Sequence, residues 1–188
     1  MDFFELLIKR RTIRDFEDKD VPRELVEQMI EDGTKAPNGG NRQPWNFIIV
    51  HSKAWIKKIS DASKRDLLAA IAKNPDHPLK RYEAGLGNEK FNVFYNAPCL
   101  VLVTGLPEAG SLVEDCSLFA AYFMLSATAR GLGTCWVALG GGVQDPELLR
   151  EIGLPEGQRI VAPIIVGYPK RIPVMPARKK PNILKVIS

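Results

Sequence analysis

The amino-acid sequence predicts one domain in which helices and β-strands alternate along the chain. Two observations carry this prediction. Four short apolar runs have the length and the β-branched residues of buried strands, and the segments between them repeat apolar residues at helical spacing. The chain of 188 residues suits a single domain with a sizeable core, and neither an internal repeat nor a clear domain boundary divides it.

The first two predicted elements are helices. Asp2 can cap a helix that carries the apolar residues of 3–7 and ends near a group of arginines. A polar link at 15–20 follows. Pro22 suits the first turn of a second helix, where its missing N–H is harmless, and Gly33 can end that helix.

The stretch 36–50, APNGGNRQPWNFIIV, joins an amide-rich loop to an apolar run. The run 47–50 is predicted to be a buried strand. The loop before it is rich in amide donors and acceptors, which suit it to holding a flat polar ligand. Loops of this composition also occur as plain connections, and the stretch taken alone favours that second interpretation.

The middle of the chain is predicted to be mostly helical. A long helix is expected over 53–73, and 74–90 is expected to be a loop with at most short helix that could serve as a mobile cover. The run 98–104 is apolar throughout, which predicts a strand covered on both faces. Residues 115–130 are apolar nearly all round, which predicts a central, buried helix.

The last third supplies two more strands and a tail. A strand is expected over 134–139, leading into the glycines of 140–142, and Asp145-Pro146 is expected to open a short helix. The run 159–168 predicts a fourth strand that Pro163 interrupts. The tail 169–188 holds four prolines and exposed-looking apolar residues near its end, which indicates an arm lying on another surface.

Composition narrows the classes of function. The net charge of +4 is too small to argue for nucleic acid, and aromatic residues do not interleave with the basic clusters at the two ends. The three cysteines form no CxxC and the two histidines lie far apart, so no metal site and no disulfide framework are expected. The N-terminus lacks a signal-peptide layout and no run of ~18 apolar residues is found, so we expect a cytoplasmic protein that does not span a membrane.

The arginines that close the first helix are the main candidates for chemistry. Arg10, Arg11 and Arg14 with Thr12 can meet a phosphate through charge-assisted hydrogen bonds. Cations at a helix C-terminus are also stabilised by the backbone dipole, which is the purely structural alternative. The basic residues near the C-terminus could meet the same anion or form a separate solvated face. Because no catalytic triad or carboxylate pair is evident, the chain looks built to hold a group that carries its own chemistry.

Four segments resemble the FMN-dependent nitroreductase family. RRTIRDF at 10–16 is similar to that family's N-terminal motif, and 36–50 resembles its loop, which ends in QPW, and the strand that follows. GLGTCWVA at 131–138 is similar to its third hallmark. PIIVGYPK at 163–170, followed by the basic RKKP at 178–181, is similar to its ending. The four segments lie in the family's order and cover nearly the whole chain.

The resemblance implies an α+β, three-layer α/β/α fold with a central, mostly antiparallel sheet. Residues 1–168 would form one FMN-binding domain, and 169–188 would be its C-terminal arm, exchanged in a homodimer that has helix 115–130 at its interface. One FMN would bind in each of two clefts shared by the subunits. Backbone at the third hallmark would lie near the N5 edge of the flavin. The implied FMN contacts are Arg10, Arg11, Thr12, Arg14 and either Arg178 or Lys180 for the phosphate and ribityl chain, Pro37, Asn38, Gly39, Asn41 and Gln43 from the other subunit, and Ala138, Leu139 and Gly140 at the ring.

The activity implied is that of an oxidoreductase without a dedicated catalytic side chain. NADH or NADPH would reduce the flavin, and a nitro compound, quinone, enone or second flavin would then accept the electrons in a ping-pong cycle. Ala138 and Leu139 stand where some members carry a glutamate, and Asn38 and Gly39 where serine is frequent, which bears on substrate choice. The alternatives are a flavin carrier or sensor, or a specialised member that performs dehalogenation or flavin cleavage.

Overall fold

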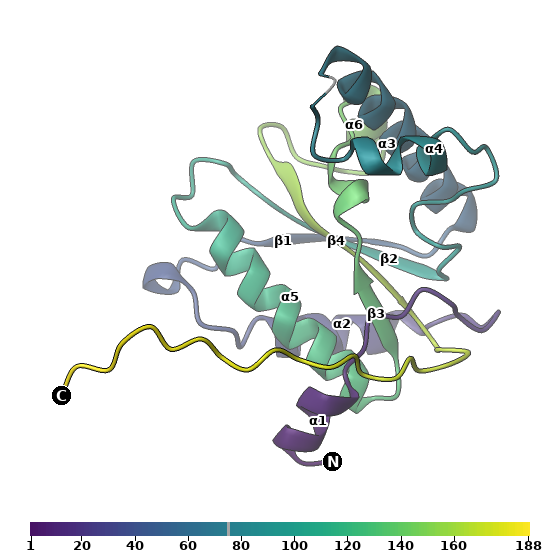
Figure 1. Cartoon of the computed structure of the whole chain (residues 1–188). Coiled ribbons are helices and arrows are strands. Elements are labelled where there is room, and N and C mark those ends of the chain that lie inside the picture. Colours follow the sequence, from purple (N-terminus) through teal and green to yellow (C-terminus); the bar gives the residue numbers. More distant parts are fainter. Residues whose placement is uncertain (75) are drawn as a thin grey trace.

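The computed structural model describes residues 1–74 and 76–188 and has three layers (Figure 1). The middle layer is a four-stranded antiparallel sheet with the spatial order β1, β2, β4, β3. Helices α2 and α5 pack on one face of the sheet, and α3 and α6 pack on the other. The α+β, three-layer α/β/α fold with an antiparallel sheet is therefore confirmed. The elements are α1 (Phe3–Lys9), α2 (Arg23–Gly33), β1 (Asn46–Val50), α3 (Lys53–Lys73), α4 (Glu83–Leu86), β2 (Cys99–Gly105), α5 (Leu112–Ala129), β3 (Gly133–Trp136), α6 (Pro146–Glu151) and β4 (Arg159–Gly167).

Strand β2 lies inside the sheet and separates two cores. Every residue of this strand is buried. Leu100 and Leu102 point into the core beneath α3, whereas Val101 and Val103 point into the core beneath α5. Because successive side chains of a strand face opposite sides, a strand with a helix layer on each side must be apolar at every position. The predicted coverage on both faces is confirmed.

The first two helices begin and end as the sequence predicts. The Asp2 carboxylate accepts the backbone N–H of Glu5, and the Glu5 side chain accepts the N–H of Asp2, which makes a complete capping box. Helix α2 begins directly after Pro22 and ends at Gly33. A Cβ at Gly33 would lie 2.5 Å from the ring of Phe119, so this glycine also allows α2 to pack closely on α5.

Strands β3 and β4 differ from the prediction. The strand expected over 134–139 stops at Trp136, and residues 138–141 form a 3-10 turn. The strand expected to break at Pro163 instead runs unbroken from Arg159 to Gly167. The two corrections share one cause. The Pro163 carbonyl accepts the N–H of Val137, and because β3 has ended there, no strand residue needs the N–H that proline lacks.

Helix α5 is less buried than predicted. It begins at Leu112, earlier than the expected Asp115, and one side packs into the core through residues such as Phe119 and Phe123. Val113, Leu118 and Tyr122 lie exposed on its other side, so the expectation that the helix is buried all round is wrong for the single chain. Among the described residues, α5 is the one helix whose length and composition would let it cross a membrane, yet it lies along the sheet as a core helix.

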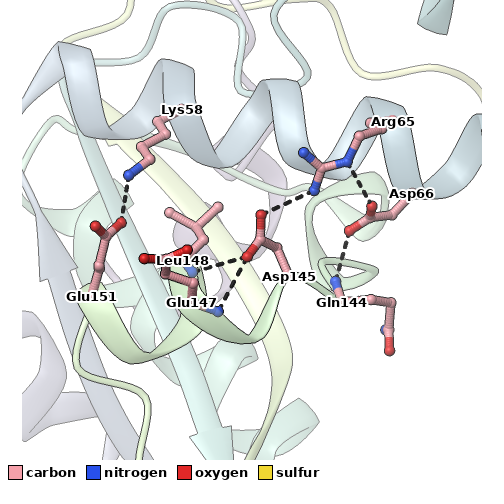
Figure 2. Close-up of polar contacts among 8 residues, drawn as sticks. All are labelled: Lys58, Arg65, Asp66, Gln144, Asp145, Glu147, Leu148 and Glu151. Carbon is pink, nitrogen blue, oxygen red and sulfur yellow. Dashed lines mark hydrogen bonds and ion pairs between the residues drawn. The ribbon is translucent and has the colours of Figure 1, made fainter.

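Polar contacts hold α6 and the two residues before it against α3 (Figure 2). The Asp66 carboxylate accepts the backbone N–H of Gln144 at 2.8 Å, and Arg65 Nη2 lies 3.2 Å from the Asp145 carboxylate. Lys58 pairs with Glu151. Asp145 also caps α6 by accepting the N–H groups of two of its residues. The chain that leaves the 138–141 turn is therefore held against α3.

The stretch 74–90 has the predicted character of a loop with short helix. A 3-10 turn spans Lys80–Tyr82 and α4 follows it, while Pro75 lies outside the described residues. The ammonium of Lys64, a buried residue of α3, donates to the carbonyls of Asn88 and Phe91 at 2.7 and 3.0 Å. This lysine ties the C-terminal base of the stretch to α3.

Candidate functional site

The segment that follows α1 is extended and lies against β3. Thr12 bridges to Thr134, and the N–H of Ile13 donates to the Thr134 carbonyl at 2.9 Å. Ile13 is buried against Gly133, where a Cβ would lie 2.5 Å from its side chain. Side chains of an extended segment alternate, so Arg10, Thr12 and Arg14 share one side and Arg11 has the other.

The surroundings of the arginines follow this alternation. Arg14 lines a cavity beside the end of β3, whereas Arg11 and Ile13 line a separate, mainly apolar cavity at the base of the C-terminal tail. The Nε of Arg11 is buried and has no hydrogen-bond partner among the described residues. The four predicted phosphate contacts are therefore divided between two faces of the segment.

Positive charge gathers around Arg10 without a balancing carboxylate. Burial is the main cause that lowers the pKa of Arg10, and repulsion from Arg11 and then from Arg178 adds to it. Arg178 belongs to the tail, so the basic clusters from the two ends of the chain lie within electrostatic reach of each other. Within the described part of the chain, Arg10, Arg11, Arg14 and Arg178 form no ion pair. Such a group of cations suits a bound anion such as a phosphate.

In the single chain, the tail contributes Arg178 to the positive charges around Arg10. Arg178 influences the pKa of Arg10, whereas Lys180 is not among the groups that do so. Arg10 and Arg14 also lie beside the thiol of Cys135. Burial raises the pKa of Cys135, and the two arginines oppose that shift, Arg14 more than Arg10.

The cavity beside Arg14 has a volume of about 220 Å³ and lies between the end of β3 and the stretch 79–82. Its floor is the backbone and side chains of 135–139, which include the predicted ring contacts Ala138 and Leu139. The guanidinium of Arg14 stands over the ring of Tyr95 at 5.6 Å. The structure thus brings Arg14 and the third sequence hallmark to one cavity and places the predicted cover at its edge.

The turn at 138–141 is fixed by α3 and by packing. The Ser63 hydroxyl donates to the Leu139 carbonyl. The N–H of Gly140 donates to the Val137 carbonyl at 2.9 Å, and a Cβ at Gly140 would lie 2.3 Å from the ring of Phe94. Gly140 is therefore required by the fold itself, whatever it contributes to a ligand.

The loop 36–43 is held rigid by its own amides. The Asn38 side chain accepts the N–H of Gln43 at 2.9 Å, and the Gln43 amide donates to the Asn41 side chain at 3.2 Å. Asp115, buried in the first turn of α5, accepts the N–H of Gly39 at 2.9 Å. Pro37, Gly39, Asn41 and Gln43 are exposed in the single chain. The loop therefore presents a preformed surface at the N-terminal end of α5.

Backbone strain marks both regions. Asn41 and Gln43 in the loop, and Tyr95 and Asn96 beside the cavity, have positive φ angles between 48° and 54°. These four are the residues other than glycine with positive φ in the described part of the chain. Left-handed backbone at such residues is uncommon and concentrates at functional sites.

The loop and the arginines lie at opposite ends of α5. Asp115 anchors the loop at the first turn, whereas the cavity of Arg11 includes Thr128 in the last turn and Gly131 just after it. A helix of 18 residues is about 27 Å long. One chain therefore does not bring its own loop 36–43 to its own arginine cluster.

Some residues at the cavity carry no sequence signal. Arg81, Tyr82 and Tyr95 line it from the cover and from the loop before β2. They stand in polar, irregular segments without helical or strand periodicity. Only the general expectation of a cover over 74–90 pointed to this region, and it named no residue.

Comparison with known proteins gives one consistent result. The family model described as the nitroreductase family matches residues 7–168. An Archaeoglobus fulgidus protein named "Putative NADH dehydrogenase/NAD(P)H nitroreductase" is 27% identical over 172 residues, which are 88% of this chain and 84% of that protein. Iodotyrosine deiodinase 1 of Mus musculus is 26% identical over 95% of this chain and 66% of its own length. A nitroreductase from Bacteroides fragilis, solved with bound FMN, superimposes with a TM-score of 0.83 at 23% identity and with full coverage of both chains.

Proposed function

The chain belongs to the nitroreductase family, and from that premise we propose that it is an FMN-dependent oxidoreductase that uses NADH or NADPH to reduce a small acceptor. The acceptor classes are nitro compounds, quinones, enones and free flavins. The observation that carries the proposal is the unbalanced cluster of Arg10, Arg14 and Arg178 beside a cavity floored by Ala138 and Leu139. A cationic cluster that can bind a phosphate, next to a cavity that can hold a ring, is the layout that a flavin mononucleotide needs.

The residues present fit FMN. Arg10 and Arg14, with Thr12 between them, would hold the phosphate and ribityl chain, and Arg178 would close on the phosphate from the tail. Arg11 lies on the other face of the segment and would contribute mainly through its charge. Backbone at Ala138, Leu139 and Gly140 would border the ring.

The loop 36–43 would complete the site from the other subunit of a homodimer. In its own chain the loop stands at the far end of α5 from the arginines. Its exposed amides, already ordered by Asn38 and Asp115, would orient the ring without further loss of loop entropy. The exposed apolar residues of α5 and of the tail support such a dimer, because a monomeric protein rarely keeps so much apolar surface exposed to solvent.

When bound, FMN supplies hydride chemistry at N5 and returns two electrons to an acceptor. The protein contributes position and electrostatics. Arg14 stabilises negative charge that develops at the cavity, and the cover 79–82 limits the access of water. A single cavity would receive the nicotinamide and the acceptor in turn, which gives ping-pong kinetics. The thiols of Cys99 and Cys116 take no part, because burial raises their pKa values to about 12 and about 11, and all three free cysteines suit a reducing cytoplasm.

Reductive dehalogenation is the second candidate, because the mouse relative is named as a deiodinase. One experiment tests the proposal and separates the two. Apoprotein is titrated with FMN and with riboflavin, and the FMN-loaded protein is then reduced anaerobically with NADH and with NADPH. A panel of nitro, quinone, enone, flavin and halophenol acceptors follows. Absence of flavin binding would overturn the proposal, and turnover of the halophenol alone would select the second candidate.

A further inference from the structure

Two arginines from different segments line the cavity beside Arg14. Arg14 stands on the wall formed by the segment after α1, and Arg81 stands on the cover. No acidic residue is among those that line the cavity within the described chain. The proposed FMN site accounts for Arg14, whereas nothing in that site accounts for Arg81.

Arg81 is also not needed by the fold. Within residues 1–74 and 76–188 its guanidinium makes no ion pair and no side-chain hydrogen bond. Its recorded contact is with the ring of its neighbour Tyr82, at 4.9 Å from the ring centroid. By contrast, Arg65 and Arg130 each contact a carboxylate that ties two elements together. A guanidinium stacked on an exposed tyrosine at a cavity mouth keeps its donors available for a ligand.

The remaining walls suit a flat ring. Tyr82 lines the cavity from the cover, and Tyr95 lines it beneath Arg14. The flavin of the proposed site would lie along the floor at 135–139, so an acceptor ring would lie between the flavin and the cover, against Tyr82. Two phenol rings supply stacking surface, and the cations supply donors for a charged substituent.

We propose that Arg81 determines the choice of electron acceptor, and that the preferred acceptors are single aromatic rings that carry an anionic group such as a carboxylate. The proposal rests on the function proposed above and narrows its acceptor class. The ring would lie between the flavin and the cover, and the anionic group would point to the guanidinium at the cover. Arg81 is a specificity-determining residue in this scheme, because it contacts a substituent and not the reacting atoms.

Two matched probes test the proposal with the FMN-loaded protein. 4-Nitrobenzoate carries the anion, and 4-nitrobenzamide has nearly the same shape without the charge. The intrinsic reactivities of the two differ, so the readout is the change in their ratio of kcat/KM between variants. We expect Arg81→Gln to lower the ratio of anion to amide about fivefold, and Arg81→Glu to lower it about tenfold or more, as for a partly exposed charge pair.

Lys80 provides the control on the same 3-10 turn. It is exposed and does not line the cavity, and Lys80→Glu makes the same change of charge as Arg81→Glu. The ratio in Lys80→Glu is expected to equal that of the unmodified protein. A fall of equal size in both variants would mean that general surface charge, and not Arg81, sets the preference, and would overturn the proposal.

Calorimetry adds a readout that does not depend on turnover. The oxidised protein is titrated with 4-nitrobenzoate and with 4-nitrobenzamide, and the tighter binding of the anion is expected to be lost in Arg81→Glu. Equal binding of the two probes to the unmodified protein would overturn the proposal even if FMN binds and is reduced. Failure to bind FMN would instead overturn the proposed function, and flavin absorbance reports that separately.

Two further outcomes would assign Arg81 to another anion. If Arg81→Glu releases FMN while Lys80→Glu keeps it, the guanidinium serves the phosphate of the cofactor. If the ratio of reduction rates with NADPH and NADH changes in Arg81→Glu alone, the guanidinium serves the phosphate of the nicotinamide donor. Either result would overturn the assignment to the acceptor.

Discussion

At the scale of single residues, the three arginines that follow α1 have different surroundings although they stand within five positions. Arg10 is partly buried among cations, Arg11 lines the apolar cavity at the base of the tail, and Arg14 stands over Tyr95. The alternation of an extended segment separates them, and the bridge between Thr12 and Thr134 fixes that alternation. Their proposed contributions to binding should therefore differ in size.

Arg10→Gln is expected to weaken FMN much more than riboflavin. A hydrogen bond to a charged group contributes about 1.5–3 kcal/mol, which is about ten- to a hundredfold in Kd. Riboflavin lacks the phosphate, so its affinity should stay unchanged. Fluorescence titration of the apoprotein with both flavins measures the two constants. Lys9→Gln removes a neighbouring exposed charge and serves as the control, and an equal loss for both flavins would place the guanidinium at the ring and not at the phosphate.

Asp32 joins the end of α2 to the end of α5. Its carboxylate lies 2.9 Å from the Lys35 ammonium, 2.8 Å from the Ser126 hydroxyl and 2.8 Å from Arg130 Nη2. The bond from Lys35, followed by that from Ser126 and the contributions of Arg130, lowers the pKa of Asp32 to about 2. A depressed carboxyl pKa stabilises the fold above the unfolded-state pKa of about 4, and this stabilisation is lost as pH falls through about 2.

We therefore expect Asp32→Asn to lower the free energy of unfolding by about 1 kcal/mol at pH 7, a value discounted because the groups are partly exposed. The difference from the unmodified protein should shrink steadily below pH 4. Urea unfolding at fixed protein concentration, followed at several pH values, measures it. Asp18→Asn, which breaks a fully exposed pair with Lys53, is the control. A difference that does not depend on pH would show that shape and not charge matters at this position.

At the scale of elements, the apolar runs predicted the sheet because burial on two faces leaves strands such as β2 no polar position. The end of β3 was predicted wrongly because it depends on distant partners, namely the Pro163 carbonyl and the ring of Phe94. The sequence motifs predicted Arg14, Ala138 and Leu139, which the structure places at one cavity. Arg81 and Tyr95 could not be predicted, because only the path of irregular loops brings them to the same place.

The tail 169–188 is an extended segment whose apolar side chains are largely exposed in the single chain. It leaves β4 as an extended segment and ends away from the sheet (Figure 1). Val174 is 92% exposed and Leu184 is 89% exposed, and the described tail forms neither helix nor strand. Exposed apolar residues in this number are typical of a segment that packs on a partner.

A chain that ends at Tyr168 is expected to lose both stable dimerisation and flavin. It lacks the apolar residues of the arm and also Arg178, which lies near Arg10. Light scattering gives the mass, and flavin absorbance gives the occupancy. Arg178→Gln in the full-length chain is the matched control, because it should weaken FMN and leave the dimer intact. A truncated chain that stays dimeric and keeps its flavin would contradict the role given to the arm.

At the scale of the whole molecule, the proposed site has two halves that one chain holds apart. The arginine segment lies toward the C-terminal end of α5, where the cavity of Arg11 includes Thr128 and Gly131, and the loop 36–43 lies at the N-terminal end, a helix length of about 27 Å away. The exposed side of α5 runs between them. A two-fold dimer that pairs α5 with its copy in antiparallel orientation would place the loop of each subunit beside the arginines of the other.

Mixing two defective chains tests this geometry. Arg14→Glu puts a carboxylate where the cavity is cationic, and Asn41→Trp puts a bulky ring on the loop, so each homodimer should lose flavin at both sites. In a mixed dimer, one shared site inherits both changes and the other inherits neither. A refolded equal mixture should recover up to about a quarter of the wild-type flavin occupancy and activity. Half of randomly paired dimers are mixed, and each mixed dimer has one intact site out of two.

Arg14→Glu mixed with Lys80→Glu, whose change lies outside the proposed site, should give about half of the wild-type occupancy, because half of all sites then carry no Arg14→Glu change, and this mixture calibrates the refolding. If the loop instead serves its own subunit, every site in the mixture carries one of the two changes and stays defective. Flavin occupancy that stays flat across the mixing series would therefore rule out shared sites, while flavin binding by the unmodified protein would be unaffected.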